Sequence, residues 1–132
     1  MNYLLDTNIC IYIINQKPAD VLQKFQTIPV GSIAIATVTV AELQCGAEKS
    51  QRVSQNKQAL EQFLLPLIIL PFDHPTAIVY GRIRTNLEKT GTPIGSLDML
   101  IAAQALSHNL TIVTNNEAEF NRVPELRVEN WV

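Results

Sequence analysis

The stretch YLLDTN, residues 3–8, places one carboxylate between two segments that are both apolar enough to be buried. Residues 2–5 are predicted to form a short buried strand, and residues 7–16 a helix that follows it directly. Desolvating an ionised carboxylate is costly unless a positive partner compensates it, and no Lys or Arg stands near Asp6 in the sequence. Asp6 therefore needs a partner that the local sequence does not supply.

Strands and helices are predicted to alternate along the rest of the chain. The further strands are expected at residues 32–36, 67–70, 110–113 and 126–128. The further helices are expected at residues 18–25, 40–47, 51–64, 76–89 and 97–106, the last of them apolar nearly all round. This alternation predicts an α/β fold: a three-layer α/β/α sandwich with a central, mostly parallel sheet.

The composition indicates a single globular domain that spans residues 1–132. Apolar residues make up 47% of the chain and charged residues 17%, which argues against disorder. No basic segment precedes an apolar stretch at the N-terminus, and the apolar runs fall well short of the roughly 20 residues of a membrane span. We therefore expect a cytoplasmic protein without a membrane partner, in which Cys10 and Cys45 are reduced thiols of the core.

The net charge of −2 argues only mildly against a nucleic-acid partner. Several acids gathered in one metal site would leave the rest of the surface positive. RNA and DNA are therefore not excluded by the overall charge.

Four acids are expected near the carboxyl ends of the strands, where open parallel sheets bind ligands. Asp6 directly follows the first strand, Glu42 lies in the helix after the second, and Glu119 comes after the fourth. Asp98 lies in the first turn of the central helix. A cluster of oxygen ligands without His or Cys selects a hard cation, Mg²⁺ or Mn²⁺. On this interpretation Asp6 is a metal ligand.

Each of these acids also has a purely structural explanation. Asp6 could cap the helix that follows it, and Glu42 completes a capping-box pattern with Thr39. A helix dipole favours an anion at Asp98, and Glu119 could be an ordinary surface acid. These structural explanations account for each acid alone, but they do not explain why several acids are expected in one place. Asp6 and Asp98 stand in strongly apolar sequence, and clustered carboxylates repel one another without a cation.

Four motifs spread over the whole chain resemble those of one family. They are LLDTN at residues 4–8, VAELQCGA at 40–47, IGSLDMLIAA at 94–103 and VTNNEAEF at 113–120. Their order and spacing are similar to those of PIN-domain ribonucleases, specifically the VapC-type toxins of VapBC toxin–antitoxin pairs. The resemblance implies a small α/β/α domain whose clustered acids bind Mg²⁺, or Mn²⁺, and cut single-stranded or looped RNA.

The resemblance also implies roles for individual acids. Asp6, Glu42 and Asp98 match the three best-defined acids of the family, and Asp6 and Asp98 are expected to hold the metal. Many PIN domains have Asp where this chain has Asn116, which is a neutral and weaker ligand. Glu119, one helical turn later, is expected to supply the missing charge as a fourth catalytic residue. This departure leaves open whether one metal or two are bound.

Other polar residues are expected to support the site or to hold the RNA. Hydrogen bonds to the phosphate or to the acids are expected from Thr7, Asn8, Thr114, Asn115 and Asn116, which are equally well explained as turn and cap residues. Contacts to the RNA backbone are expected from Lys49, Arg82 and Arg84, with Arg52 and Lys89 as further candidates. For most of these cations, solvated surface charge is the simpler explanation.

The resemblance finally implies partners. We expect a cognate VapB-type antitoxin, a homodimer with a higher complex when the antitoxin binds, and a structured RNA substrate, with a tRNA loop as the first candidate. Cleavage of that RNA would inhibit translation as the toxin of a type II pair.

The sequence also allows two other kinds of function to be considered. One is a non-catalytic module whose acidic pocket only receives a basic antitoxin tail, with an apolar groove formed by the helices at residues 39–64. The other is phosphoryl transfer. A haloacid-dehalogenase-type enzyme would need a second Asp where this chain has Asn8, and a receiver domain would need an Asp after its third strand. Neither phosphoryl-transfer pattern is present.

Overall fold

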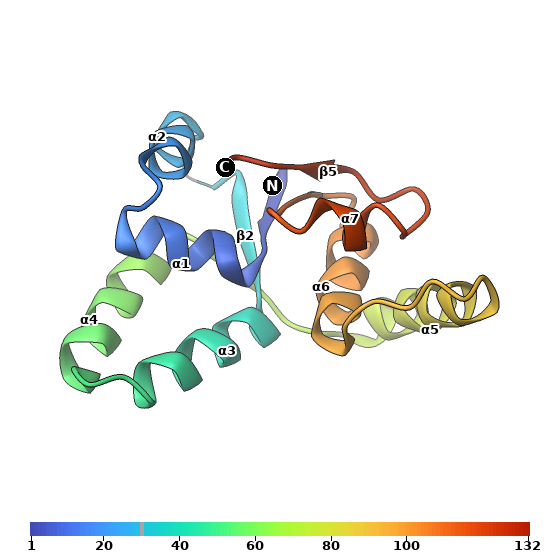
Figure 1. Ribbon diagram of the computed structural model, residues 1–132, viewed down its shortest axis with the longest axis horizontal. Helices are drawn as coiled ribbons and strands as arrows, with labels where there is room; N and C mark the ends of the chain where they lie inside the picture. The colour runs from blue at the N-terminus through green and yellow to red at the C-terminus, as the bar shows by residue number, and fades with distance from the viewer. Residues whose placement is uncertain (30) are drawn as a thin grey trace.

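A five-stranded parallel sheet forms the centre of the molecule, as the sequence predicts (Figure 1). The computed structural model describes residues 1–29 and 31–132. The strands are β1 (Tyr3–Leu5), β2 (Ile33–Ala36), β3 (Ile68–Leu70), β4 (Thr111–Val113) and β5 (Val128–Glu129), in the spatial order β3-β2-β1-β4-β5. Leu4 pairs with Ala34 of β2 on one side and with Ile112 of β4 on the other, so β1 lies in the middle.

Helices cover both faces of this sheet and complete the predicted three layers. The helices of the described residues are α1 (Thr7–Asn15), α2 (Ala19–Thr27), α3 (Thr37–Glu48), α4 (Val53–Leu64), α5 (His74–Lys89), α6 (Ser96–Ser107) and α7 (Glu117–Phe120). Figure 1 shows α1 to α4 on one side of β1 and β2, and α5 and α6 on the other.

The core divides into two apolar clusters, because successive side chains of a strand point to opposite faces. Leu4 of β1 packs into the cluster that contains Ile83 of α5 and Ile101 of α6. Leu5, the next residue, packs into the cluster with Ile9 of α1 and Leu60 of α4. The first strand is therefore buried on both faces, and Asp6, the residue that follows it, is buried at the end of this central strand.

The buried side chain of Gln104 in α6 ties three elements together. Its Nε2 atom donates to the carbonyl oxygens of Leu70 (2.9 Å) and Pro71 (3.0 Å), at the end of β3. The same Leu70 carbonyl accepts a bond from Thr37 Oγ1 at the start of α3 (2.7 Å). These bonds hold the start of α3 and the end of β3 against α6.

Helix α3 begins at Thr37, three residues before the predicted start, and this overturns the capping-box explanation for Glu42. The N-cap residue is Ala36, without a side-chain hydrogen bond. Thr39 lies inside the helix, and its buried hydroxyl has no partner among the described residues. The helix starts early because Thr37 turns its hydroxyl to the end of β3.

Three further expectations are wrong in detail. Helix α5 begins at His74 because Asp73 caps it, accepting a bond from the Thr76 backbone N–H (3.0 Å). The periodicity of residues 76–89 predicts Ile78 on the inner face of the helix, but this side chain is 54% exposed. Cys45 is an exposed thiol and not a core residue, whereas Cys10 is buried as expected; both are free. Helix α7 was not predicted.

No helix within the described residues is long and apolar enough to cross a membrane.

Candidate active site

Asp6 is buried at the junction of β1 and α1, and two donors hold its carboxylate. The Oδ1 atom accepts a hydrogen bond from the backbone N–H of Thr7 (2.7 Å), which makes Asp6 the N-cap of α1. The Oδ2 atom accepts from the hydroxyl of Thr114 (2.8 Å), the residue directly after β4. The side chain is only 5% exposed. Adjacent parallel strands thus deliver both partners to the same edge of the sheet.

Burial raises the pKa of the Asp6 carboxyl above its ordinary value, and the negative charge of Glu119 adds to this. The hydrogen bonds from Thr114 and Thr7 act in the opposite direction, because they stabilise the ionised form. The capping explanation for Asp6 is correct but incomplete. The cap uses the Oδ1 atom alone, and the carboxylate also lies near other acids, since the charge of Glu119 affects its pKa.

Asp98 and Glu119 form the second part of this group. Burial raises the pKa of Asp98 to about 7, helped by a hydrogen bond to the Glu119 carboxylate and by the negative charges of Asp6 and Glu119. The bond from Asp98 lowers the pKa of Glu119, as do the bond from Asn116 and the positive charge of Arg122. Of the two carboxyls, Asp98 therefore binds a proton more readily than Glu119.

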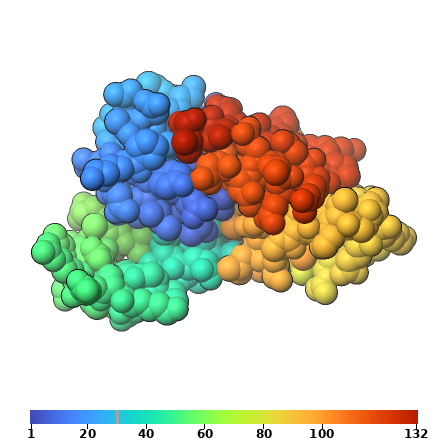
Figure 2. Space-filling view, in the orientation of Figure 1, coloured from blue at the N-terminus to red at the C-terminus, as the bar shows by residue number. Residues whose placement is uncertain are grey.

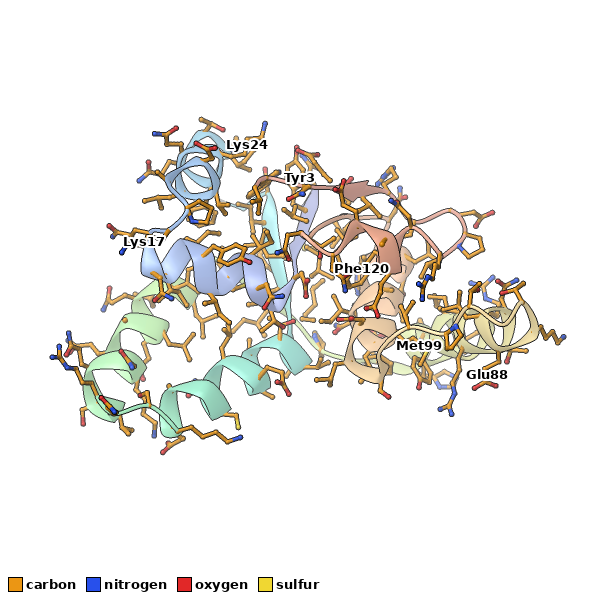
Figure 3. All side chains as sticks on the ribbon, in the orientation of Figure 1. Tyr3, Lys17, Lys24, Glu88, Met99 and Phe120 are labelled. Atoms are coloured by element: carbon orange, nitrogen blue, oxygen red, sulfur yellow. The ribbon has the colours of Figure 1, made fainter. Side chains whose placement is uncertain are left out.

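Local structure brings Asp98 and Glu119 together from two helices. Asp98 lies in the first turn of α6, where its Oδ2 atom would be in van der Waals contact (3.4 Å) with a Cβ atom at Gly95. Met99 and Phe120, the residues that follow Asp98 and Glu119, are both buried in the core cluster that contains Leu4 (Figure 3). The core thus anchors both helices next to the acids.

The supporting polar residues fall into two groups. Thr114 and Asn116 belong to the acidic group: the Asn116 backbone N–H donates to Thr114 Oγ1 (2.9 Å), and its Nδ2 atom donates to Glu119 Oε2 (2.8 Å). Asn115 is turned toward α1, where its Nδ2 atom donates to the hydroxyl of Tyr12 (2.9 Å). Asn8 is exposed on the first turn of α1.

Glu42 is placed differently from the other three acids. It is exposed on α3 and lines a groove of about 260 Å³ between α1, α3 and α4. Figure 1 shows the starts of α1, α3 and α6 and the short α7 around one end of the sheet, and Figure 2 shows the same face in space-filling form. Of the four acids, Glu42 is the one that lines the groove. The catalytic role of Glu42 stays a prediction.

The expected RNA-binding cations also stay predictions. Arg84 is bound to Glu88 (2.9 Å) and to the hydroxyl of Tyr80 (3.3 Å) on the exposed side of α5. Arg82 lies on the same helix, and Lys49 follows the last turn of α3. A cation that the sequence analysis did not consider, Arg122, lies beside Glu119. Its spacing of three residues from Glu119 is the signal that could have identified it.

The donor set fits a hard cation. In the described ranges, no group of three or more Asp, Glu, His or Cys side chains is arranged to hold a metal ion by itself. Mg²⁺ usually keeps several waters and needs only one or two carboxylates together with a substrate phosphate. Asp6 and Asp98 match this requirement, since both are partly desolvated oxygen ligands whose pKa values are raised in the absence of a positive partner.

Comparison with known proteins shows the family to which this chain belongs. The PIN domain family model matches residues 3–126. The chain is 44% identical over 132 residues to ribonuclease VapC2 of Rickettsia felis, covering 99% of this chain and 98% of the relative. It is also 44% identical to the tRNA(fMet)-specific endonuclease VapC of Shigella flexneri, with the same coverage.

Solved structures of toxin–antitoxin complexes share the fold. The VapBC2 complex of Rickettsia felis, bound to a DNA fragment from its promoter, contains a chain with a TM-score of 0.93 and 43% identity, covering 100% of both chains. The DNA-bound VapBC complex of Salmonella typhimurium gives a TM-score of 0.94 at 39% identity, covering 100% of this chain and 99% of that one. The protein belongs to the PIN domain family and, within it, to the VapC ribonucleases.

The pKa of Asp98 makes a prediction for the metal-free protein. The pKa of Asp98 rises from 3.8 in the unfolded chain to about 7 in the folded protein. Between pH 3.8 and about pH 7 the folded state therefore binds more protons than the unfolded state. Its contribution to the free energy of unfolding is therefore complete below pH 4 and is lost as the pH rises toward 7. We expect the melting temperature in EDTA to fall over this range more steeply for the wild type than for Asp98→Asn. Equal slopes in the two proteins would contradict the raised pKa.

Proposed function

We propose that the protein is a metal-dependent endoribonuclease that acts as the toxin of a type II toxin–antitoxin pair. The observation that carries this proposal is the grouping of Asp6, Asp98 and Glu119 at the carboxyl end of the central strands. Membership of the VapC ribonucleases supports the reaction class. The buried charge supports a cation, because it is otherwise unfavourable.

Asp6 and Asp98 would hold Mg²⁺, with Mn²⁺ as a substitute. A bound divalent ion lowers the pKa of a coordinated water and polarises a phosphate. The chain supplies the orientation: Thr7 and Thr114 fix the two oxygens of Asp6, so the carboxylate cannot rotate away. Asp98 would be ionised as a metal ligand, and Glu119, which accepts a hydrogen bond from Asn116 (2.8 Å), would be available to accept a proton from a water.

We propose a tRNA as the substrate. The relatives from Shigella flexneri and Salmonella typhimurium are both named tRNA(fMet)-specific endonucleases, at 44% and 40% identity over nearly the whole chain. Asp98 and Glu119 are half-buried, so the acidic group is accessible to a looped strand from their side. Initiator tRNA is therefore the first substrate to test.

The groove beside Glu42 is proposed as the site of a VapB-type antitoxin. Its walls are mostly apolar, with Ile11, Ile14 and Leu43 among them, and Glu42 lies in the same lining. A segment with apolar side chains followed by an Arg or Lys would fill the groove and bring its charge to the acids. The solved neighbours are complexes of a VapC-type chain with its antitoxin, which supports a partner of this kind.

The expected homodimer stays a prediction. Ile69, Phe72 and Ile78 are 45%, 37% and 54% exposed and follow one another from the edge strand β3 into α5. An apolar surface of this kind is consistent with self-association.

Cleavage of purified initiator tRNA tests the proposed reaction. We expect discrete cuts with Mg²⁺, none with EDTA, and a loss of at least about 100-fold in rate for Asp98→Asn, because one carboxylate ligand becomes a neutral amide. Asp20→Asn, an exposed acid of α2, is the matched control and should cleave at the wild-type rate. Cleavage that persists in EDTA or in Asp98→Asn would contradict the proposal. A protein that binds antitoxin but cuts no RNA in Mg²⁺ or Mn²⁺ would favour the non-catalytic alternative.

The antitoxin groove is tested by placing a charge in it. Ala59 is exposed on α4 and lines the groove, so Ala59→Glu should weaken binding of the antitoxin at least about tenfold while leaving tRNA cleavage unchanged. Gln58→Glu adds the same side chain at the neighbouring exposed position, which does not line the groove, and should bind normally. Equal affinities for the two variants, measured by calorimetry, would place the antitoxin elsewhere.

A further inference from the structure

Arg122 connects the helix that carries Glu119 to the segment that leads to Asp98. Its backbone N–H donates to the Glu119 carbonyl (3.0 Å), which closes the turn after α7. Its side-chain Nη1 atom donates to the carbonyl of Pro93 (2.8 Å). Pro93 stands two residues before Gly95, the N-cap of α6, and Asp98 follows in the first turn. The guanidinium is therefore held at the side of the acidic group, between its two helices.

The site needs a positive group here for an electrostatic reason. Asp6, Asp98 and Glu119 already repel one another, and an RNA phosphate would add a further negative charge. Two bound phosphates flank any internal phosphodiester that is cut, and a divalent ion held by Asp6 and Asp98 compensates only the charge next to it. A fixed cation at the rim would hold a flanking phosphate.

Arg122 has the free capacity to do this. A guanidinium has five N–H donors in a planar fork, and the bond to Pro93 uses one of them. The ion pairs within residues 1–29 and 31–132 are Lys57 with Glu48 and Arg84 with Glu88, so Arg122 is not in a close pair with a carboxylate. Its side chain is exposed, which leaves the remaining donors open to a ligand from solvent.

We propose that Arg122 is a phosphate-binding residue of this site, oriented by the Pro93 carbonyl so that its free N–H groups receive an RNA phosphate next to the one that is cut. This inference rests on the proposed ribonuclease function. It also distinguishes Arg122 from the cations of α5, of which Arg84 is bound by Glu88 and Tyr80.

The chain offers a matched control in Arg127. This side chain is also exposed and also donates to a backbone carbonyl, that of Asn109 (2.6 Å). Asn109 precedes β4, at the end of the sheet opposite to Thr114 and the acids. Arg127→Gln therefore removes the same charge and the same type of bond at a position remote from the site.

The experiment measures RNA binding without turnover. A fluorescein-labelled anticodon stem–loop of initiator tRNA is titrated with protein in EDTA, over 50 to 300 mM KCl as a rough working range, and log Kd is plotted against log salt. We expect Arg122→Gln to raise Kd about tenfold near 100 mM salt and to reduce the salt slope by about 0.7, the value for one single-strand phosphate contact. Arg122→Lys should keep most of the slope but bind less tightly, because it keeps the charge without the fork.

The outcomes separate this inference from the function on which it rests. Arg127→Gln should match the wild type in both Kd and slope, and all variants should retain the wild-type melting temperature within a few degrees. If Arg122→Gln binds with the wild-type slope, or if the two Gln variants lose slope equally, Arg122 does not hold a phosphate, although the nuclease function stands. If the wild-type protein neither binds nor cuts the RNA, the proposed function and this inference are both wrong.

Discussion

The hydrogen bond between Thr114 and Asp6 is the interaction on which the rest of the site depends. It joins the ends of the two central strands, 108 positions apart in the chain, and it is buried. In the low dielectric of the core, a carboxylate without donors would take up a proton or force the strands apart. With one oxygen on Thr114 and the other on the start of α1, Asp6 can be both buried and correctly oriented. The two bonds stabilise the ionised form without cancelling the effect of burial, which still raises its pKa.

The second constraint is repulsion among the acids. Asp98 lies close enough to Asp6 and Glu119 for both to raise its pKa, and Asn116 and Arg122 help Glu119 to stay ionised. Repulsion among the acids therefore favours protonation of Asp98 in the metal-free protein. Asn116 donates a hydrogen bond to Glu119, whereas a carboxylate at position 116 would repel it. This arrangement is consistent with the prediction that Glu119 supplies the fourth acid of the site.

Much of this was predictable from the sequence, for definite physical reasons. Alternating apolar strands and helices predict the parallel sheet, and the topology of such a sheet brings Asp6 and Thr114 to one edge. The apolar sequence around Asp98 predicts the burial that raises its pKa.

The start of α3 was predicted wrongly because Thr39 and Glu42 match a local capping pattern. The helix instead begins at Thr37, whose hydroxyl donates to the Leu70 carbonyl, 33 positions away in the chain. Ile78 was misplaced because periodicity alone does not show which apolar residue of α5 is left exposed at the edge of the sheet. Arg122 was not identified, since its side-chain bond joins the turn after α7 to the segment before α6 and it lies outside the four motifs.

The central claim is that Asp6 and Asp98 together hold a divalent cation. Anomalous diffraction from crystals grown with Mn²⁺, collected at the manganese edge, tests it directly without any assumption about the RNA. The account predicts one strong anomalous peak bonded to an oxygen of each carboxylate, on the side of Asp6 that faces Asp98 and Glu119. A fully occupied manganese peak elsewhere, with none between Asp6 and Asp98, would contradict it.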